Sequence, residues 1–428
     1  MKNQPNAQLK AKAFYSGFPH AHDTYLALSR GSDGKIYYIL SSEIPDEGGK
    51  FYVFDPTNDE ITLLADLTDA CGEKDLNAIA QGKSHVEFYE ADGKLYFATH
   101  VGYYEMIDGM ERLPENAPDG LALYPGGHFL SYDIQNGKIK DLGIMPHGEG
   151  VLSMAMDVLR KQILAISWPS GYLVHLDVNT GKVQNMGLIS HKGEAGKVGN
   201  DYRVLCRSLL NDPSTGKFYF STSEGDIYCF DPQPEGSFYK LKDVNLRLDY
   251  FGQYDPTQPG SMGYNWRKVI WNEKEGVAYG VHGNSGYLFK FDPQNQSLEL
   301  VERLTSLPSR KSGMFDQFSY GYLGFQLGPD GETIYYLTGG PIYQEGKRLV
   351  GEKQIAKGGA KGLESLHLIT YHIPSGSSTD HGPIFYPDGS IPTYVNSIAI
   401  DFQGKVYALA RMQSEFGEIQ DLIQISAD

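Results

Sequence analysis

The sequence is poor in cysteine. Its 428 residues contain only Cys71, Cys206 and Cys229, with no Cys-x-x-Cys pair. Three widely spaced cysteines neither build a disulfide framework nor supply the ligand spacing of a zinc ribbon. Cys206 and Cys229 fall within apolar segments, which favours small buried thiols. The cysteines therefore indicate no redox or zinc function.

Positive charge is also scarce. Lys and Arg number 37 against 53 Asp and Glu, which gives a formal net charge of −16. A strongly acidic surface disfavours nucleic acid and anionic membranes as partners, so we expect neither. If the ligand is itself an anion, the positive charge that binds it must be local. Individual Arg and His residues are therefore more informative than the total.

Long hydrophobic runs are missing as well. No window approaches the about 20 consecutive apolar residues of a membrane-spanning helix. The segment from Met1 to Lys12 is polar and lacks the apolar core of a signal peptide. We expect a secreted or periplasmic protein whose leader has been removed, with a cytoplasmic location as the alternative.

What the chain has in abundance is glycine, with 50 residues, and aromatic side chains, with 30 Tyr and 20 Phe. They recur in one pattern, a turn followed by an apolar strand, and a further strand that often ends in Asp-Pro. The turn and its strand occur seven times, near residues 33–38, 92–97, 160–165, 215–220, 275–279, 330–336 and 403–407. Repeats of roughly 55–70 residues built only of short strands are typical of a β-propeller.

We therefore predict an all-β fold in which residues 1–428 form one domain, a seven-bladed β-propeller. The expected blades are 22–66, 83–143, 149–188, 202–247, 263–305, 317–384 and 392–428. The last blade lacks an outer strand, which would leave an open edge. The segment from Ala7 to Ser16 alternates enough to be that strand and to close the ring. We expect a monomer.

In a propeller, the first strand of each blade lines the central channel, and its start lies beside the end of the second strand. These two positions in every blade form one mouth of the channel. They are rich in His and Arg: His20, His22, Lys83, His85, His100, His147, Glu149, Trp168, Tyr172, Arg203, Arg207, Trp266, Arg267, His282, Tyr320, Asn396 and Arg411. Arginines gathered in an acidic chain predict an anionic ligand, most simply a carboxylate held in a bidentate way.

One long stretch breaks the blade rhythm directly after His100. The segment from Glu105 to Gly126 contains Pro114, Pro118 and Pro125. Loops of this length are usually functional covers or simply mobile.

Three short motifs resemble those of seven-bladed polysaccharide lyases. They are Lys83-x-His85 with the hairpin that ends at His100, the segments Tyr124 to His128 and Trp168 to Tyr172, and Arg203-x-x-x-Arg207. The family comprises ulvan lyases and rhamnose–glucuronate lyases, some first described as α-L-rhamnosidases. The resemblance implies a site that acts on uronate-containing sugars.

The resemblance implies catalytic roles for His85, His100 and Tyr172, and substrate binding by Arg203 or Arg207. Further candidate substrate-binding residues, from the family or from the mouth positions, are His282, Trp168, Arg267, Tyr320 and Arg411. The expected partner is an anionic oligosaccharide or polysaccharide. No cofactor is required, although His20 and His22 leave a structural metal ion open.

The chemistry that fits this set is β-elimination at a uronic acid. Cations neutralise the carboxylate and the developing charge, and His or Tyr moves the protons. An α-L-rhamnosidase-type hydrolase is the first alternative, but hydrolysis usually needs paired carboxylates. Glu149 is the one obvious acid among the mouth positions. A non-catalytic carbohydrate-binding propeller is the second alternative.

Overall fold

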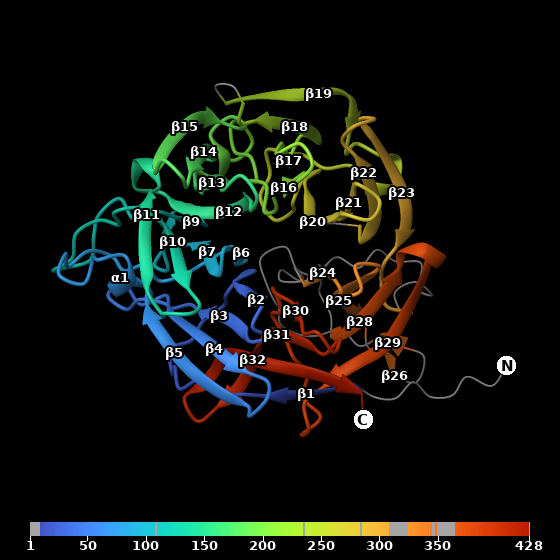
Figure 1. Cartoon of the computed structure of the whole chain (residues 1–428), viewed down its shortest axis with the longest axis horizontal. Coiled ribbons are helices and arrows are strands. Elements are labelled where there is room, and N and C mark those ends of the chain that lie inside the picture. Colours follow the sequence, from blue (N-terminus) through green and yellow to red (C-terminus); the bar gives the residue numbers. More distant parts are fainter. Residues whose placement is uncertain are drawn as a thin grey trace.

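The structure is a computed structural model that describes residues 9–107, 109–233, 236–282, 285–307, 324–341, 343–344, 347–348 and 364–427. These residues form an all-β fold in which sheets stand side by side around a central axis (Figure 1). The helices are short: α1 (Leu67–Ala70), η1 (Pro146–Gly148), η2 (Gly193–Ala195), η3 (Asp249–Phe251) and η4 (Ile373–Ser375). No helix within the described ranges is long and apolar enough to cross a membrane.

Five of the sheets in the described part of the chain have four antiparallel strands each. The first two are β2 (Leu28–Arg30), β3 (Ile36–Leu40), β4 (Lys50–Asp55) and β5 (Glu60–Asp66), then β6 (Tyr89–Ala91), β7 (Lys94–Ala98), β10 (His128–Asp133) and β11 (Ile139–Ile144). The third is β12 (Gly150–Asp157), β13 (Gln162–Trp168), β14 (Tyr172–Asp177) and β15 (Lys182–Leu188). The others are β16 (Leu210–Asn211), β17 (Phe218–Ser221), β18 (Asp226–Asp231) and β19 (Ser237–Asn245), then β20 (Trp266–Asn272), β21 (Val277–His282), β22 (Tyr287–Asp292) and β23 (Ser297–Arg303).

An eight-stranded sheet completes the ring. Its order is β24 (Phe325–Leu327), β25 (Thr333–Pro341), β28 (Glu364–His372), β29 (Ser377–Phe385), β1 (Leu9–Ala13), β32 (Gly417–Ala427), β31 (Val406–Ser414) and β30 (Ala399–Ile400). Two small hairpins lie outside the large sheets, β8 (Glu105–Ile107) with β9 (Met110–Arg112), and β26 (Tyr343–Gln344) with β27 (Lys347–Arg348).

The N-terminal strand pairs with the C-terminal strand, as the sequence predicted. β1 runs antiparallel to β32, from Leu9 opposite Ala427 to Ala13 opposite Ile423, and also pairs with β29 over two residues. Figure 1 shows β1 at the outer edge beside β32. Beyond β1, the backbone amide and hydroxyl of Ser16 donate to the carboxylate of Asp421 at 2.7 and 2.5 Å. Both ends of the chain thus belong to one sheet.

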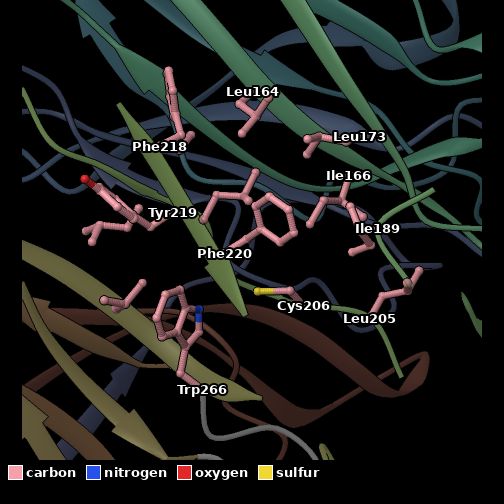
Figure 2. Packing of buried hydrophobic residues seen from close by; sticks show 14 of the residues in the cluster. Leu164, Ile166, Leu173, Ile189, Leu205, Cys206, Phe218, Tyr219, Phe220 and Trp266 are labelled. Atoms are coloured by element: carbon pink, nitrogen blue, oxygen red, sulfur yellow. The ribbon is translucent and has the colours of Figure 1, made fainter. Parts of the chain in front are cut away.

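Burial falls from the axis outward because inner strands are covered by the neighbouring sheets. Every residue of β12 and β13 is buried, whereas the outer strand β15 is half-buried or exposed. Aromatic and aliphatic side chains fill the space between sheets, as Figure 2 shows for Phe218 and Phe220 of β17, which lie among residues of β13 and β14. Such contacts need both neighbours, so a single sheet could not be stable alone.

Serine side chains join the inner strands of adjacent sheets. The hydroxyl of Ser29 accepts a hydrogen bond from the Phe88 amide at 3.1 Å, and that of Ser208 accepts one from the Val269 amide at 3.2 Å. Ser153 donates to the Cys206 carbonyl at 3.0 Å. These bonds satisfy backbone groups that the short inner strands leave unpaired.

The Asp-Gly turns form tight hairpins. Asp92 and Gly93 separate the paired residues Ala91 and Lys94, with φ values of 50° and 68°. Two successive positive φ values are what a type I′ turn requires, and Asp-Gly tolerates them well. This turn sets the register of β7 against β6. It therefore also sets the position of His100, just after β7 ends.

We predict that docking of β1 is required for stability. Ala11 of β1 is fully buried within the eight-stranded sheet, whereas Ala13 of the same strand is exposed. Ala11→Asp should lower the free energy of unfolding by about 3–5 kcal/mol, since it buries an unpaired charge. Denaturant unfolding measures this. Ala13→Asp is the matched control and should change stability by no more than about 0.5 kcal/mol; equal effects of the two variants would contradict the prediction.

Candidate functional site

The site is built where β7 ends. The amide of Lys83 donates to the carbonyl of His100 at 2.9 Å, and the amide of His100 donates back to the carbonyl of Lys83 at 2.7 Å. This antiparallel bridge places the segment before β6 beside the residue after β7. The rings of His85 and His100 consequently lie together, with centroids 4.2 Å apart.

Aromatic rings enclose the two histidines. Tyr25 stacks on His85 at 4.8 Å with an interplanar angle of 12°. Trp168 lies 5.5 Å and Tyr104 6.3 Å from His100, centroid to centroid. His100 is only 1% exposed, while His85 is half-buried. The backbone of Gly150 closes the remaining side of His100, since a Cβ there would lie 2.8 Å from its Cδ2 and 3.1 Å from its Nε2.

Hydrogen bonding determines which nitrogen of His100 carries the proton. Nδ1 lies 2.8 Å from the carbonyl oxygen of Val101, which can only accept, so Nδ1 is the donor. In the neutral ring, Nε2 then presents a lone pair. Within the described ranges, neither this Nε2 nor that of His85 has a hydrogen-bond partner, although both atoms are enclosed. Buried polar atoms usually have a partner, so both nitrogens are candidates to act on a ligand.

Both histidines are held in the neutral form. Burial lowers the pKa of His100 to about 3, with the charges of Lys83 and Arg207 acting in the same direction against the hydrogen bond to Val101. The pKa of His85 is also well below its ordinary value, through burial first and then the neighbouring His100, Lys83 and Arg207. At neutral pH both rings are therefore uncharged, and each keeps one nitrogen unprotonated.

Two cations flank the histidine pair, and each has a carboxylate partner. The ammonium of Lys83 lies 2.6 Å from Oε1 of Glu43 and 5.0 Å from the centroid of Tyr104. Nη2 of Arg207 lies 2.7 Å from Oε1 of Glu194. Both cations near the histidines are thus paired with carboxylates in this structure.

A small pocket lies beside His85. Its empty volume, open solvent included, is about 220 Å³, and His85 and Arg207 both line it. Lys268 of β20 and Glu87 also line this pocket and form an ion pair at 2.7 Å. The pocket is therefore charged and opens beside the half-buried histidine rather than beside His100.

The other sequence-predicted residues have different surroundings. Trp168 belongs to the histidine cluster, and its Nε1 donates to Glu194 at 2.9 Å. Arg203 pairs instead with Glu224 at 2.6 Å. Tyr172 stacks on His147 at 4.4 Å. Tyr320 lies outside the described residues.

Three further predicted residues lie on β20, β21 and β31. His282 stacks on Phe251 at 4.1 Å, shares a 2.8 Å hydrogen bond with Ser285, and has a pKa lowered to about 3 by burial. Arg411 pairs with Asp23 and, at 3.2 Å, with Glu418. Arg267 is buried, 9% exposed, at the start of β20.

The histidines considered for a metal bind separate carboxylates. His20 lies 3.0 Å from Glu47, and His22 lies 3.1 Å from Glu43. In the described part of the chain, no three His, Cys, Asp or Glu side chains form a cluster that could hold a metal ion. All three cysteines are free and buried.

Sequence reasoning missed Tyr25, Tyr104, Glu43 and Glu194. Tyr25, Tyr104 and Glu43 lie outside the strands and Glu194 lies in the one-turn helix η2, so no strand period marks them. Only folding brings them to the histidines. The count of acids was also incomplete, because Glu43 and Glu194 stand beside the two cations. Glu149, the acid that the sequence suggested, is buried and accepts hydrogen bonds from Ser167 and from the Ser170 amide.

Comparisons with known proteins support the fold class. No protein-family model matches the sequence, and no curated protein matches it significantly. An oligogalacturonate lyase from Vibrio parahaemolyticus has a similar structure, with a TM-score of 0.50 and 8% identity over 98% of this chain and 97% of that one. The β-propeller domain of Cps50 (Swd1) from Myceliophteria thermophila gives a TM-score of 0.51 and 10% identity over 95% and 98%. At these identities the likeness concerns the fold alone, a β-propeller.

We predict that His100 is neutral and carries its proton on Nδ1 throughout the range from pH 4 to 8. The lowered pKa and the hydrogen bond to Val101 require this. NMR of protein with ¹⁵N-labelled histidine distinguishes the two tautomers and the imidazolium, and His100→Gln assigns the signal. A His100 signal that titrates near 6.5 would contradict the proposed environment.

We also predict that the buried histidines make the fold sensitive to acid. The pKa of His100 is about 3 in the folded protein and about 6.5 when unfolded. Between these values the unfolded chain binds more protons, so stability falls as the pH falls, by up to about 1.4 kcal/mol per pH unit.

His100→Gln should reduce the slope of unfolding free energy against pH between pH 7 and 5, measured by denaturant titration. His372→Gln, at an exposed histidine bound to Ser375, is the control and should retain the wild-type slope. The same slope in the wild type and in both variants would show that His100 is not responsible.

Proposed function

We propose that this protein is a seven-bladed propeller lyase that cleaves a glycosidic bond at a uronic acid by β-elimination, with a rhamnose–glucuronate glycan as substrate. The observation that carries the proposal is the contact of two neutral histidines, His85 and His100, between Lys83 and Arg207. In this proposal the five separate sheets and the two halves of the eight-stranded sheet are the blades.

The reaction needs a base, a cation and a proton donor. The base removes the proton from C5 of the uronate, and the electron pair forms the C4–C5 double bond as the bond from C4 to the leaving oxygen breaks. That oxygen receives a proton from the donor. Arg207 beside the pocket would bind the carboxylate, whose charge grows as the C5 proton leaves.

A bound carboxylate would also adjust the histidines. Their low pKa makes them weak bases in the free protein. An anion near the rings favours the imidazolium and raises the pKa towards the working pH, where proton transfer is most effective. Substrate binding would therefore activate the base, and we assign that role to His85, which lines the pocket.

The roles of the remaining residues follow from their contacts. His100 lies behind His85 and would act through it, or directly once its cover moves. Two tyrosines are candidate proton donors: Tyr172, which the family resemblance implies, and Tyr25, which stacks on His85. The lyase fold of the Vibrio protein is consistent with the proposal but does not carry it.

We predict that His85→Ala and His100→Ala each lower the rate of unsaturated product formation by about 10²–10⁴-fold, as loss of a general acid or base typically does. Rhamnose–glucuronate oligosaccharides from ulvan or gum arabic are the test substrates. Ultraviolet absorbance of the unsaturated uronate follows the reaction. Tyr172→Phe and Tyr25→Phe, assayed in parallel, identify the donor.

His372→Ala provides the control, since this exposed histidine binds Ser375 rather than the site. It should retain wild-type activity. A saturated glucuronate product would indicate hydrolysis and reject the lyase assignment. Binding of these glycans without turnover would favour a carbohydrate-binding propeller.

A further inference from the structure

The insertion after His100 folds over the site. It leaves β7 through Tyr104, whose ring contacts His100 and meets Trp168 edge-to-face at 5.3 Å. The ammonium of Lys83 lies against the same ring. Tyr104 directly precedes β8. The chain therefore enters the β8–β9 hairpin from a residue that covers the histidine pair.

The end of this hairpin is hydrogen-bonded to the segment between β15 and β16. At the end of β9, the guanidinium of Arg112 donates through Nη1 to the carbonyl of Glu194 and through Nη2 to that of Gly196 at 3.2 Å. Met110 packs against a buried cluster of Tyr202, Val204 and Met262. The cover therefore spans from the second sheet to the segment that leads into β16.

Glu194 connects this fastening to the cation of the site. Its carbonyl accepts from Arg112, while its carboxylate accepts from Trp168, from the Leu205 amide at 3.0 Å and from Arg207. The residue is 9% exposed. A shift of the Glu194 backbone would therefore move the carboxylate that holds Arg207.

Burial of His100 makes the cover necessary to the site. His100 is 1% exposed beneath Tyr104 and Trp168, yet its Nε2 has no hydrogen-bond partner in the described part of the chain. For that nitrogen to reach a ligand, a covering group must move. The hairpin that follows Tyr104 is held at its far end by contacts that include the hydrogen bonds of Arg112 and the packing of Met110, so its release would uncover His100.

We propose that Arg112 is a positioning residue: by binding the backbone of Glu194 it keeps the β8–β9 hairpin closed over His100 and keeps Arg207 beside the two histidines. Its consequence for catalysis rests on the proposed function. The positions that the proposal gives to the hairpin and to Arg207 do not rest on that function. They can be tested without any substrate.

The test is the titration of His100 in the Arg112→Ala protein, followed by NMR of ¹⁵N-labelled histidine. The charged or titratable groups that face His100 are His85, Lys83 with Glu43, Arg207 with Glu194, and Tyr104. If the hairpin opens and Arg207 moves away, burial and positive charge both decrease around His100. Its pKa should then rise by about one pH unit or more, since each unit corresponds to 1.4 kcal/mol of changed interaction.

Arg160→Ala is the matched control. Arg160 also donates to two backbone carbonyls of a neighbouring sheet, those of Pro213 and Ser214 at 3.0 and 3.3 Å, but contacts none of these site residues. It should leave the pKa of His100 unchanged. Arg112→Lys keeps the charge and one donor, so it should give an intermediate pKa and serves if the alanine variant does not fold.

An unchanged His100 pKa in the folded Arg112→Lys and Arg112→Ala proteins would overturn the proposal, as would an equal rise in Arg160→Ala. Activity supplies a separate readout. If the lyase assay succeeds, Arg112→Ala should raise KM for the uronate more than it lowers kcat, because Arg207 binds the carboxylate. If no glycan is turned over, the titration still decides the proposal.

Discussion

The rest of the molecule depends on the pairing of β1 with β32. A ring of sheets has no stable partial form, because each sheet buries its faces only against both neighbours. Here the closing sheet takes strands from the two ends of the chain, and Asp421 fastens Ser16 just beyond β1. The inner strands are held against one another as a consequence. The positions of the site residues near the axis therefore depend on this closure of the ring.

The site combines charge with burial. In an acidic protein, Lys83 and Arg207 lie close to two imidazoles, and each cation has a carboxylate of its own. The carboxylates limit the cost of burying the cations. The cations and the lack of solvent keep both histidines neutral. In the proposed function, a bound anion beside the rings would raise the basicity of both histidines.

The groups that bury His100 also block its access to a ligand. The aromatic rings that contribute to the burial of His100 also cover it, so direct contact between His100 and a ligand requires the cover to move. Glu194 lies at the junction, because its main chain holds the covering hairpin and its side chain holds Arg207. Opening and ligand binding would thus be coupled through one residue, without any large movement of the sheets.

The repeated turns and strands were sufficient to predict the all-β fold, the approximate sheet boundaries and the pairing of the chain ends, because hairpin register depends on local sequence. The same register predicted that His85 and His100 are neighbours. The sequence did not indicate that Tyr172 stacks on His147 or that Arg203 binds Glu224. It also could not indicate that Tyr104 and Glu194 meet at the site, because Tyr104 lies outside the strands and Glu194 in the one-turn helix η2, and the course of both segments depends on contacts between sheets. Such contacts join residues far apart in the chain, and no local pattern records them.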